Sequence, residues 1–185
     1  MSDDGDETVL IVDDEEQLAE SYALHLDGHY ETDIATSGGE ALSKLGPDID
    51  VVLLDRRMPG MAGDDVIERI GEWDLEFQVV IVSAIDPDTD IIGLPIDGYL
   101  TKSVSKEELL DAVDRALLKA RYEQLISEYN AVAETHDVLQ EEYAQSELET
   151  KDEFDDLEDR MASLEADIDA VVDDLGDSSI TNIFD

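Results

Sequence analysis

The fold is decided by the stretch Val51-Val52-Leu53-Leu54-Asp55-Arg56-Arg57-Met58-Pro59-Gly60. Its four consecutive apolar residues predict a short strand that is buried on both faces, as in parallel sheets covered by helices. Met58-Pro59-Gly60 ends this strand, because proline fixes its own φ and glycine accepts conformations that other residues avoid. Asp55 is therefore expected at the carboxyl end of a central strand, where open α/β sheets bind ligands.

Three further apolar runs end on polar side chains in the same way. Parallel strands would bring these carboxyl ends to one rim of the sheet. Residues 30–35 predict one more strand, at the sheet edge, and helical patterns separate the runs, so the chain predicts a doubly wound α/β fold with five parallel strands. The runs and their polar ends are residues 8–12 with Asp13 and Asp14, residues 78–82 with Ser83, and residues 98–101 with Lys102.

The composition is strongly acidic, with 51 Asp and Glu against 11 Lys and Arg and a net charge of −40. Because 42% of the residues are hydrophobic and fall in periodic runs, we expect a folded protein adapted to concentrated salt, with an ordinary acidic protein as the alternative. At about 1 M salt the Debye length is roughly 3 Å, so surface carboxylates scarcely repel one another. The sequence has no basic cluster, which argues against direct binding of nucleic acid.

The location expected from the sequence is the cytoplasm. No apolar run approaches the length of about 20 residues that a membrane-spanning helix needs. Residues 1–7 are acidic and lack the apolar core of a signal peptide.

The helix expected after Ser105 continues past the α/β domain. A first apolar series runs from Tyr122 to Tyr143, and a second from Phe154 to Leu175 keeps three unbroken heptads, a pattern typical of a coiled-coil seam. The two series are out of phase by four residues. This predicts either one long coiled-coil helix with a stutter or a helical hairpin that turns near residues 147–152, and we slightly favour the hairpin. The expected domains are a disordered acidic tail at 1–7, the α/β domain at 8–120, an acidic helical domain at 121–176 and a loose C-terminus at 177–185.

The polar residues at the predicted rim suit phosphoryl chemistry. Clustered carboxylates need a cation, and oxygen ligands suit Mg²⁺, which favours phosphate-bearing partners. Asp55 is the best candidate for a nucleophile that forms an acyl phosphate, with Lys102 as a second cation and Ser83 as a hydrogen-bond donor. The alternative is structural: Asp13 and Asp14 cap the following helix and Lys102 pairs with an acid.

The first 120 residues or so resemble the receiver domain of two-component response regulators, which has a flavodoxin-like fold. The resemblance implies that Asp55 accepts a phosphoryl group from a histidine kinase. It also implies that Asp13 and Asp14 hold Mg²⁺ together with Asp55 and the backbone carbonyl of Arg57, and that Ser83 and Tyr99 are a switch pair. The matching motifs are Val12-Asp13-Asp14, Leu54-Asp55-x-x-Met58-Pro59-Gly60, Ser83-Ala84 and Tyr99-Leu100-x-Lys102.

Two features depart from the receiver pattern. Ser103 follows Lys102, where receivers usually have proline, often with a cis bond. A non-proline cis bond costs about 3 kcal/mol, so we expect a trans bond or a strained loop. Residues 84–99 leave room for at most two turns of the fourth helix, which puts dimerisation through the fourth helix, fifth strand and fifth helix in doubt.

The acidic helical region resembles the haloarchaeal HalX domain, which is found after receivers. We therefore expect a signalling protein that is not an enzyme beyond its own phosphorylation and dephosphorylation. Its helical region would bind an output partner that the sequence does not identify, or a second copy to give a homodimer. One alternative is a transcription regulator that acts through DNA or basal factors. Another is an Asp-nucleophile phosphatase, although such enzymes commonly have a second Asp at the position of Arg57.

Overall fold

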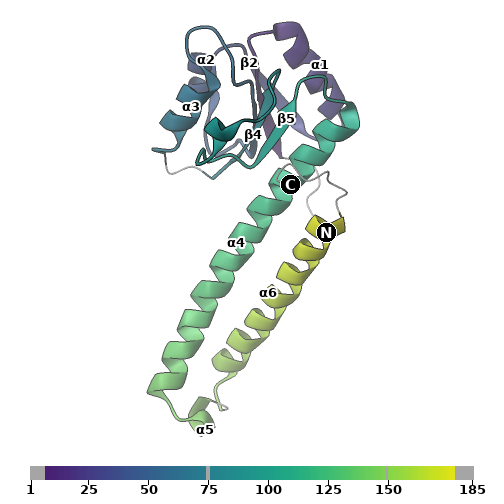
Figure 1. Cartoon of the computed structure of the whole chain (residues 1–185). Coiled ribbons are helices and arrows are strands. Elements are labelled where there is room, and N and C mark those ends of the chain that lie inside the picture. Colours follow the sequence, from purple (N-terminus) through teal and green to yellow (C-terminus); the bar gives the residue numbers. More distant parts are fainter. Residues whose placement is uncertain (1–6, 74–75, 149, 178–185) are drawn as a thin grey trace. The chain divides into compact units, whose positions relative to one another are not determined.

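The computed structural model describes residues 7–73, 76–148 and 150–177 (Figure 1). Apart from Glu7 and Asp177, the predicted acidic tail at 1–7 and the predicted loose C-terminus at 177–185 lie outside the described residues. The chain forms two compact units, one that extends to Leu117 and one that begins at Leu118.

A five-stranded parallel sheet is the centre of the first unit, which confirms the predicted fold class. The strands are β1 (Thr8–Val12), β2 (Glu31–Ala35), β3 (Val51–Leu54), β4 (Gln78–Ser83) and β5 (Gly98–Thr101). Their order is β2-β1-β3-β4-β5, so β3 is central and β2 is an edge strand, as predicted. All four residues of β3 are buried, because helices cover both faces of the sheet.

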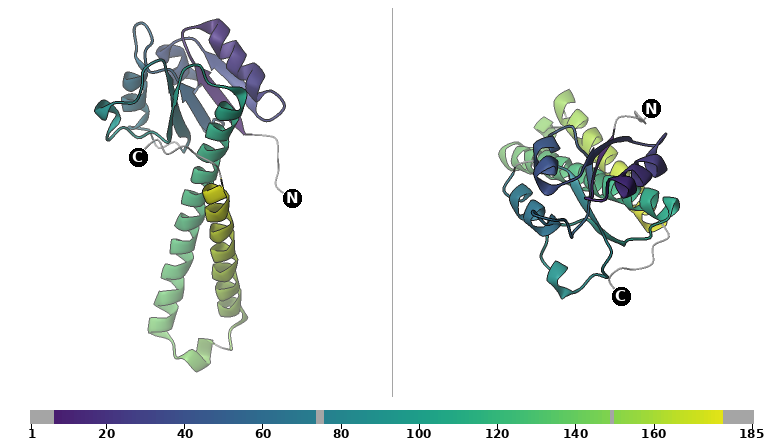
Figure 2. Two further views of the ribbon diagram at one scale, coloured as in Figure 1. Left: turned by 45° about the vertical axis from the view of Figure 1, so that its right-hand side comes forward. Right: turned by 90° about the horizontal axis from the view of Figure 1, so that it is seen from above.

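The helices of the first unit lie on both sides of this sheet (Figures 1 and 2). One side carries α1 and the beginning of α4, whose side chains Tyr22, Leu26 and Leu109 pack against β1 and β3. The other side carries α2 and α3, which contribute Ala41 and Val66 to a second apolar cluster. The helices are α1 (Glu16–Leu26), α2 (Gly38–Lys44), α3 (Gly63–Ile70) and α4 (Lys106–Glu142).

Side-chain caps set the start of two of these helices. At α2, the Ser37 hydroxyl accepts the backbone N–H of Glu40. At α4, the Ser105 hydroxyl accepts the N–H of Glu108, and the Glu108 carboxylate accepts the N–H of Ser105. This reciprocal capping box satisfies two backbone donors that the helix itself leaves unpaired, and it confirms the start predicted for α4.

The segments on either side of β5 contain the two departures from the receiver pattern, namely the short connection from β4 and the serine at position 103. Between β4 and β5 there is a single 3-10 turn, η1 (Thr89–Ile91). It is shorter than the two turns allowed by the sequence, since Gly93 takes a φ of 90° soon after it. No peptide bond within the described residues is cis, so the bond between Lys102 and Ser103 is trans. The strain lies instead at Ser103, whose φ of 90° is unfavourable for a residue with a side chain.

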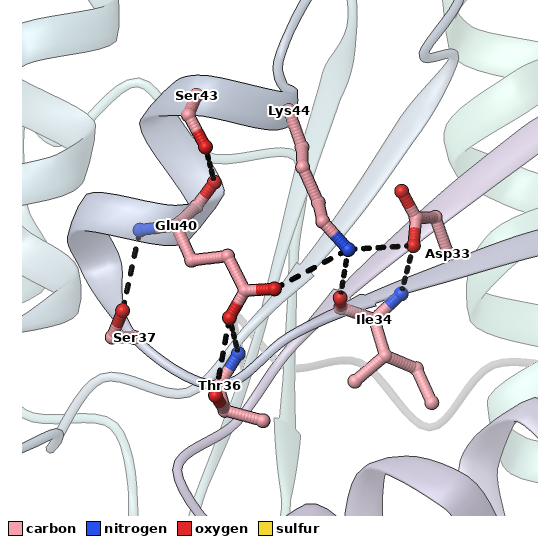
Figure 3. Close-up of polar contacts among 7 residues, drawn as sticks. All are labelled: Asp33, Ile34, Thr36, Ser37, Glu40, Ser43 and Lys44. Carbon is pink, nitrogen blue, oxygen red and sulfur yellow. Dashed lines mark hydrogen bonds and ion pairs between the residues drawn. The ribbon is translucent and has the colours of Figure 1, made fainter.

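Side chains from α2 and β2 cover the backbone of Ile34 on the β2 edge of the sheet (Figure 3). Lys44 Nζ donates to the backbone oxygen of Ile34 at 2.5 Å and to Asp33 Oδ1 at 2.8 Å. The same Asp33 oxygen accepts the backbone N–H of Ile34 at 2.8 Å. Glu40 lies 3.4 Å from the ammonium group and also accepts hydrogen bonds from Thr36. Both backbone polar groups of Ile34, in a strand that has no neighbour on one side, are thereby satisfied.

The second unit is a helical hairpin. Helix α4 leads through the short α5 (Gln145–Leu148) into α6 (Asp152–Asp177), and α4 and α6 run side by side in both views (Figures 1 and 2). Leu125, Leu164 and Val171 are buried between them. The hairpin, which the sequence slightly favoured, is formed instead of one long helix with a stutter. No helix in the described part of the chain is both long and apolar enough to cross a membrane.

Candidate functional site

Three carboxylates meet where β1 and β3 end. Asp13 and Asp14 follow β1, and Asp55 follows β3. The two strands are neighbours in register, and the Asp55 N–H donates to the Val12 oxygen at 2.8 Å. One oxygen from each carboxylate lies within 4.8 Å of the others, with Asp13 and Asp55 buried and Asp14 exposed. The structure thus brings together the three acids that the sequence placed at one rim.

Lys102 lies between two of these acids. Its Nζ atom is 2.8 Å from Asp55 Oδ2 and 2.9 Å from Asp13 Oδ2. Burial alone would lower the pKa of Lys102, but the hydrogen bonds to Asp55 and Asp13 raise this pKa above its ordinary value. Glu15 adds a third carboxylate oxygen at 3.6 Å. Lys102 is therefore a permanently charged group held beside the Asp55 carboxylate.

The acids outnumber the cations at this site. Burial raises the pKa of Asp13 above its ordinary value, and the charge of Asp55 acts in the same direction, although hydrogen bonds from Lys102 and from the Glu15 N–H oppose the rise. A buried carboxylate with another beside it disfavours its own ionised form. Carboxylate oxygens, one of them on an exposed side chain, are the donor set that Mg²⁺ prefers. The residues present therefore fit a magnesium ion.

Ser83 and Tyr99 both contact the backbone of Ile85. The Ser83 hydroxyl, at the end of β4, accepts the Ile85 N–H at 3.4 Å. The Tyr99 hydroxyl donates to the Ile85 oxygen at 2.6 Å. Tyr99 is only 5% exposed, so its side chain points inward. One residue of the loop after β4 thus links the two side chains of the expected switch pair, and this link could not be read from the sequence.

The two arginines after Asp55 have different surroundings. The Arg57 N–H donates to Asp55 Oδ1 at 3.1 Å, and the role of the Arg57 carbonyl as a metal ligand stays a prediction. Arg56 forms an ion pair with Asp64 in the first turn of α3, with Nε 2.9 Å from Oδ1. This pair ties the loop that carries Asp55 to the helix that follows it.

Gly63 is a site residue that the sequence did not reveal. A Cβ atom at this position would lie 2.5 Å from the backbone carbonyl oxygen of Asp55 and 2.8 Å from the Cα atom of Arg56. The Gly63 N–H donates to the Arg56 oxygen at 2.9 Å. The first residue of α3 therefore lies directly against the backbone of the acidic site. In the sequence it is only a glycine at the start of a predicted helix.

Two family models match the chain. The model described as the response regulator receiver domain matches residues 9–114, and the model described as the HalX domain matches residues 118–184.

Individual proteins and structures agree with these family matches. A Haloferax volcanii protein named "Putative transcriptional regulator" is 39% identical over 90% of this chain, which spans 29% of that protein. The response regulator TrrA from Thermotoga maritima, solved in complex with Mg²⁺ and BeF, is 31% identical over 60% of this chain and 99% of its own, with a TM-score of 0.55. A CheY-like receiver domain from Methanospirillum hungatei, 24% identical, covers 63% of this chain and 98% of its own with a TM-score of 0.59, which supports the fold alone. The chain spans only 29% to 51% of the first curated relatives that it matches.

Proposed function

This chain belongs to the response regulators, with a receiver domain followed by a HalX domain, and we propose that Asp55 accepts a phosphoryl group from a histidine kinase. The observation that carries the proposal is the position of Lys102 Nζ, 2.8 Å from Asp55 Oδ2 and 2.9 Å from Asp13 Oδ2. A cation fixed beside a carboxylate at the rim of a parallel sheet is suited to binding phosphoryl oxygens.

The proposed transfer uses groups at this rim, the Mg²⁺ ion that they would hold, and the phosphohistidine of the kinase. A carboxylate oxygen of Asp55 attacks the phosphorus of a phosphohistidine, an oxygen–phosphorus bond forms, and the phosphorus–nitrogen bond breaks with its electron pair returning to the imidazole. Lys102 and Ser83 bind phosphoryl oxygens. Mg²⁺, held by Asp13, Asp14 and Asp55 and by the Arg57 carbonyl, would offset the charge of those oxygens.

The switch proposed for this receiver runs through Ile85. When the Ser83 hydroxyl turns toward a phosphoryl oxygen, it gives up the Ile85 N–H, which it contacts at 3.4 Å. Tyr99 is bonded to the oxygen of the same residue. Phosphorylation therefore shifts the loop between β4 and η1 and alters the hydrogen bond from the Tyr99 hydroxyl to the Ile85 oxygen in that loop.

We also propose that the acidic helical domain, at residues 121–176, is the output region of a receiver at residues 8–120 and that the protein works in the cytoplasm. The output is contact with a partner protein or with a second copy. The name of the Haloferax relative favours transcriptional control as a second candidate, although this chain spans 29% of that protein. With a net charge of −40, such control would act through protein contacts rather than through DNA phosphates.

The test is phosphorylation of the full chain in concentrated KCl with Mg²⁺ and a small-molecule phosphodonor. Intact mass reports labelling, and light scattering reports self-association. Asp55→Ala should abolish labelling, whereas Asp86→Ala, which removes an exposed acid after β4, should not. A donor-dependent rise in the particle mass measured by light scattering would assign the output to self-association. Labelling of Asp55 without a rise in particle mass would assign the output to a partner protein. Unlabelled wild-type chain, or equal labelling of Asp55→Ala, would overturn the proposal.

A further inference from the structure

One peptide unit joins the start of α3 to the Asp55 carboxylate, namely the peptide between Arg56 and Arg57. Its oxygen accepts the Gly63 N–H at 2.9 Å. Its N–H donates to Asp55 Oδ1 at 3.1 Å. Because a peptide unit is planar and rigid, its oxygen and its N–H cannot turn independently of each other. The orientation of this one plane therefore relates the first residue of α3 to one oxygen of Asp55.

A side-chain ion pair holds the same peptide from outside the acidic cluster. Arg56 Nε lies 2.9 Å from Asp64 Oδ1 and 3.2 Å from Asp64 Oδ2, and Arg56 Nη2 donates to Asp64 Oδ2 at 3.0 Å. Two nitrogens of a planar guanidinium on the two oxygens of one carboxylate fix the orientation of both groups. The Arg56 side chain is only 12% exposed, so salt screens this pair less than it screens a pair on the open surface.

The backbone of Arg56 packs closely against α3, and the Asp55 carboxylate is held at both of its oxygens. A Cβ atom at Gly63 would lie 2.8 Å from the Cα atom of Arg56. Lys102 holds Asp55 Oδ2 at 2.8 Å, while the peptide described above holds Oδ1. The plane of that peptide ends at the Cα atom of Arg57, which also carries the carbonyl predicted to bind Mg²⁺. A tilt of the plane would therefore move a carboxylate oxygen and a predicted metal ligand together.

We infer that Arg56 and Asp64 are positioning residues for the acidic cluster, because their ion pair orients the peptide unit that holds Asp55 Oδ1 and leads to the Arg57 carbonyl. Neither side chain contacts the phosphoryl group or the metal in the proposed transfer. For labelling, this role rests on the proposed phosphorylation of Asp55. The hold on the peptide itself can be measured without metal or phosphodonor, so the two proposals can fail separately.

The first turn of α3 offers a matched pair of variants. Asp64 and Asp65 are both acidic residues of this turn, so replacing either with Ala removes the same kind of favourable interaction with the helix dipole. Asp65 Oδ2 accepts the Ala62 N–H at 3.0 Å, whereas Asp64 pairs with Arg56. A loss of stability at the start of α3 alone would therefore appear in Asp65→Ala as well.

The first measurement is amide hydrogen exchange, followed by NMR on the full chain in concentrated KCl with EDTA. In Asp64→Ala the Arg57 amide should exchange about fivefold faster than in wild type, since a bidentate pair no longer holds its peptide. In Asp65→Ala the Ala62 amide should exchange faster, and the Arg57 amide should not change. Asp64→Asn keeps the shape of the side chain and should lie between wild type and Asp64→Ala. It replaces Asp64→Ala if circular dichroism shows that variant unfolded.

The second measurement is the initial rate of Asp55 labelling by a phosphodonor, together with calorimetric titration of Mg²⁺. Asp64→Ala should slow labelling about tenfold, as expected for a displaced reacting group, and should weaken Mg²⁺ binding. Asp65→Ala should leave both unchanged. In a chain that already carries Arg56→Met, adding Asp64→Ala should change the labelling rate by less than about twofold, because the two residues act as one unit.

Three results would overturn the positioning role. The Arg57 amide could exchange at the wild-type rate in Asp64→Ala, or exchange faster while labelling stayed unchanged. Asp65→Ala could slow labelling as much as Asp64→Ala does. Asp64→Ala could slow labelling equally with and without Arg56. A wild-type chain that is never labelled would instead overturn the proposed function, and the Arg57 exchange rate would still show whether the ion pair holds the peptide.

Discussion

Lys102 Nζ lies 2.8 Å from Asp55 Oδ2, although 47 residues separate the two along the chain. The strand order explains the contact, since β3 and β5 both run toward the same rim with β4 between them. The lysine neutralises part of the charge of the acidic cluster. In the proposed transfer it would also bind phosphoryl oxygens. These two roles can be separated by mutation.

Replacing Lys102 with Met should affect the two roles in opposite directions. Labelling of Asp55 by a phosphodonor should slow by about a hundredfold or more, as expected for loss of a group that stabilises transition-state charge. Affinity for Mg²⁺ should rise, because the carboxylates lose their neutralising partner. Initial labelling rates and calorimetric titration measure the two effects, with Lys106→Met, at an exposed position, as the control. An unchanged labelling rate would contradict the role given to Lys102.

Magnesium should stabilise the folded chain through the acidic cluster. At a concentration 100-fold above its Kd, the ion should add about 2.7 kcal/mol to the free energy of unfolding. Denaturant unfolding at constant KCl, with Mg²⁺ or with EDTA, measures the difference. Asp13→Asn should lose most of it, and Asp86→Asn should keep it. Equal stabilisation of both variants would place the ion elsewhere.

Gly63→Ala should destabilise the loop that follows β3 and begins at Asp55, although Gly63 is not one of the clustered acids. The new Cβ atom would lie 2.5 Å from the backbone carbonyl oxygen of Asp55. We therefore expect the free energy of unfolding to fall by about 1–3 kcal/mol and the phosphodonor to label Asp55 more slowly. Gly39→Ala is the matched control, because a Cβ there meets nothing within 4 Å and the position is helical. That change should be neutral or stabilise by up to about 1 kcal/mol. A Gly63→Ala chain as stable as wild type would show that the loop can move aside.

Ser103→Gly should stabilise the receiver by about 1 kcal/mol, since glycine relieves the unfavourable φ of 90°. Ser103→Pro should destabilise it, although receivers usually have proline here, because proline fixes φ near −65°. Urea unfolding of both variants provides the comparison. If the proline variant were the more stable, the backbone at Ser103 would have to adopt a different conformation from the one described.

Lys44→Met should lower the free energy of unfolding by about 0.5 kcal/mol near neutral pH, as is typical of exposed ion pairs. The Lys44 ammonium lowers the pKa of Asp33 from its ordinary value of 3.8. A carboxyl whose pKa is depressed in the folded state adds stability above its unfolded pKa, and that stability is lost as the pH falls through the folded pKa. The difference between wild type and variant should therefore shrink below pH 3.8. If the difference in unfolding free energy between wild type and Lys44→Met stayed constant until Asp33 was fully protonated, the ion pair with Asp33 would not be the source of that difference.

The sheet and the acidic cluster were predictable because they depend on local patterns. Unbroken apolar runs such as residues 51–54 define buried parallel strands, and the first polar residue after each run marks the rim. Asp13, Asp55 and Lys102 meet for that reason. The Ser105 capping box was readable for a similar reason, since both of its partners lie within one turn.

The contacts of Ile85 and Gly63 around the acidic cluster were not predictable, because they involve loops whose paths depend on tertiary packing. Nothing near Ile85 indicates that its backbone links Ser83 and Tyr99. The approach of Gly63 to Asp55 requires the position of α3 on the sheet. In the second unit, the phase shift between the two apolar series allowed either a stutter in one long helix or a turn, and the short helix α5 in the observed turn has no periodic signal of its own.

The side chains around Ile34 have a consequence for assembly. An uncovered edge strand can recruit a strand from another molecule and begin aggregation. Here Lys44 and Asp33 occupy the Ile34 carbonyl and amide, so an incoming strand would have to break an ion pair to form its hydrogen bonds. A crowded, salt-rich solution removes much of the charge repulsion that keeps acidic proteins apart. In such a solution the contacts at Ile34 discourage strand-to-strand stacking through β2, the edge strand that they occupy.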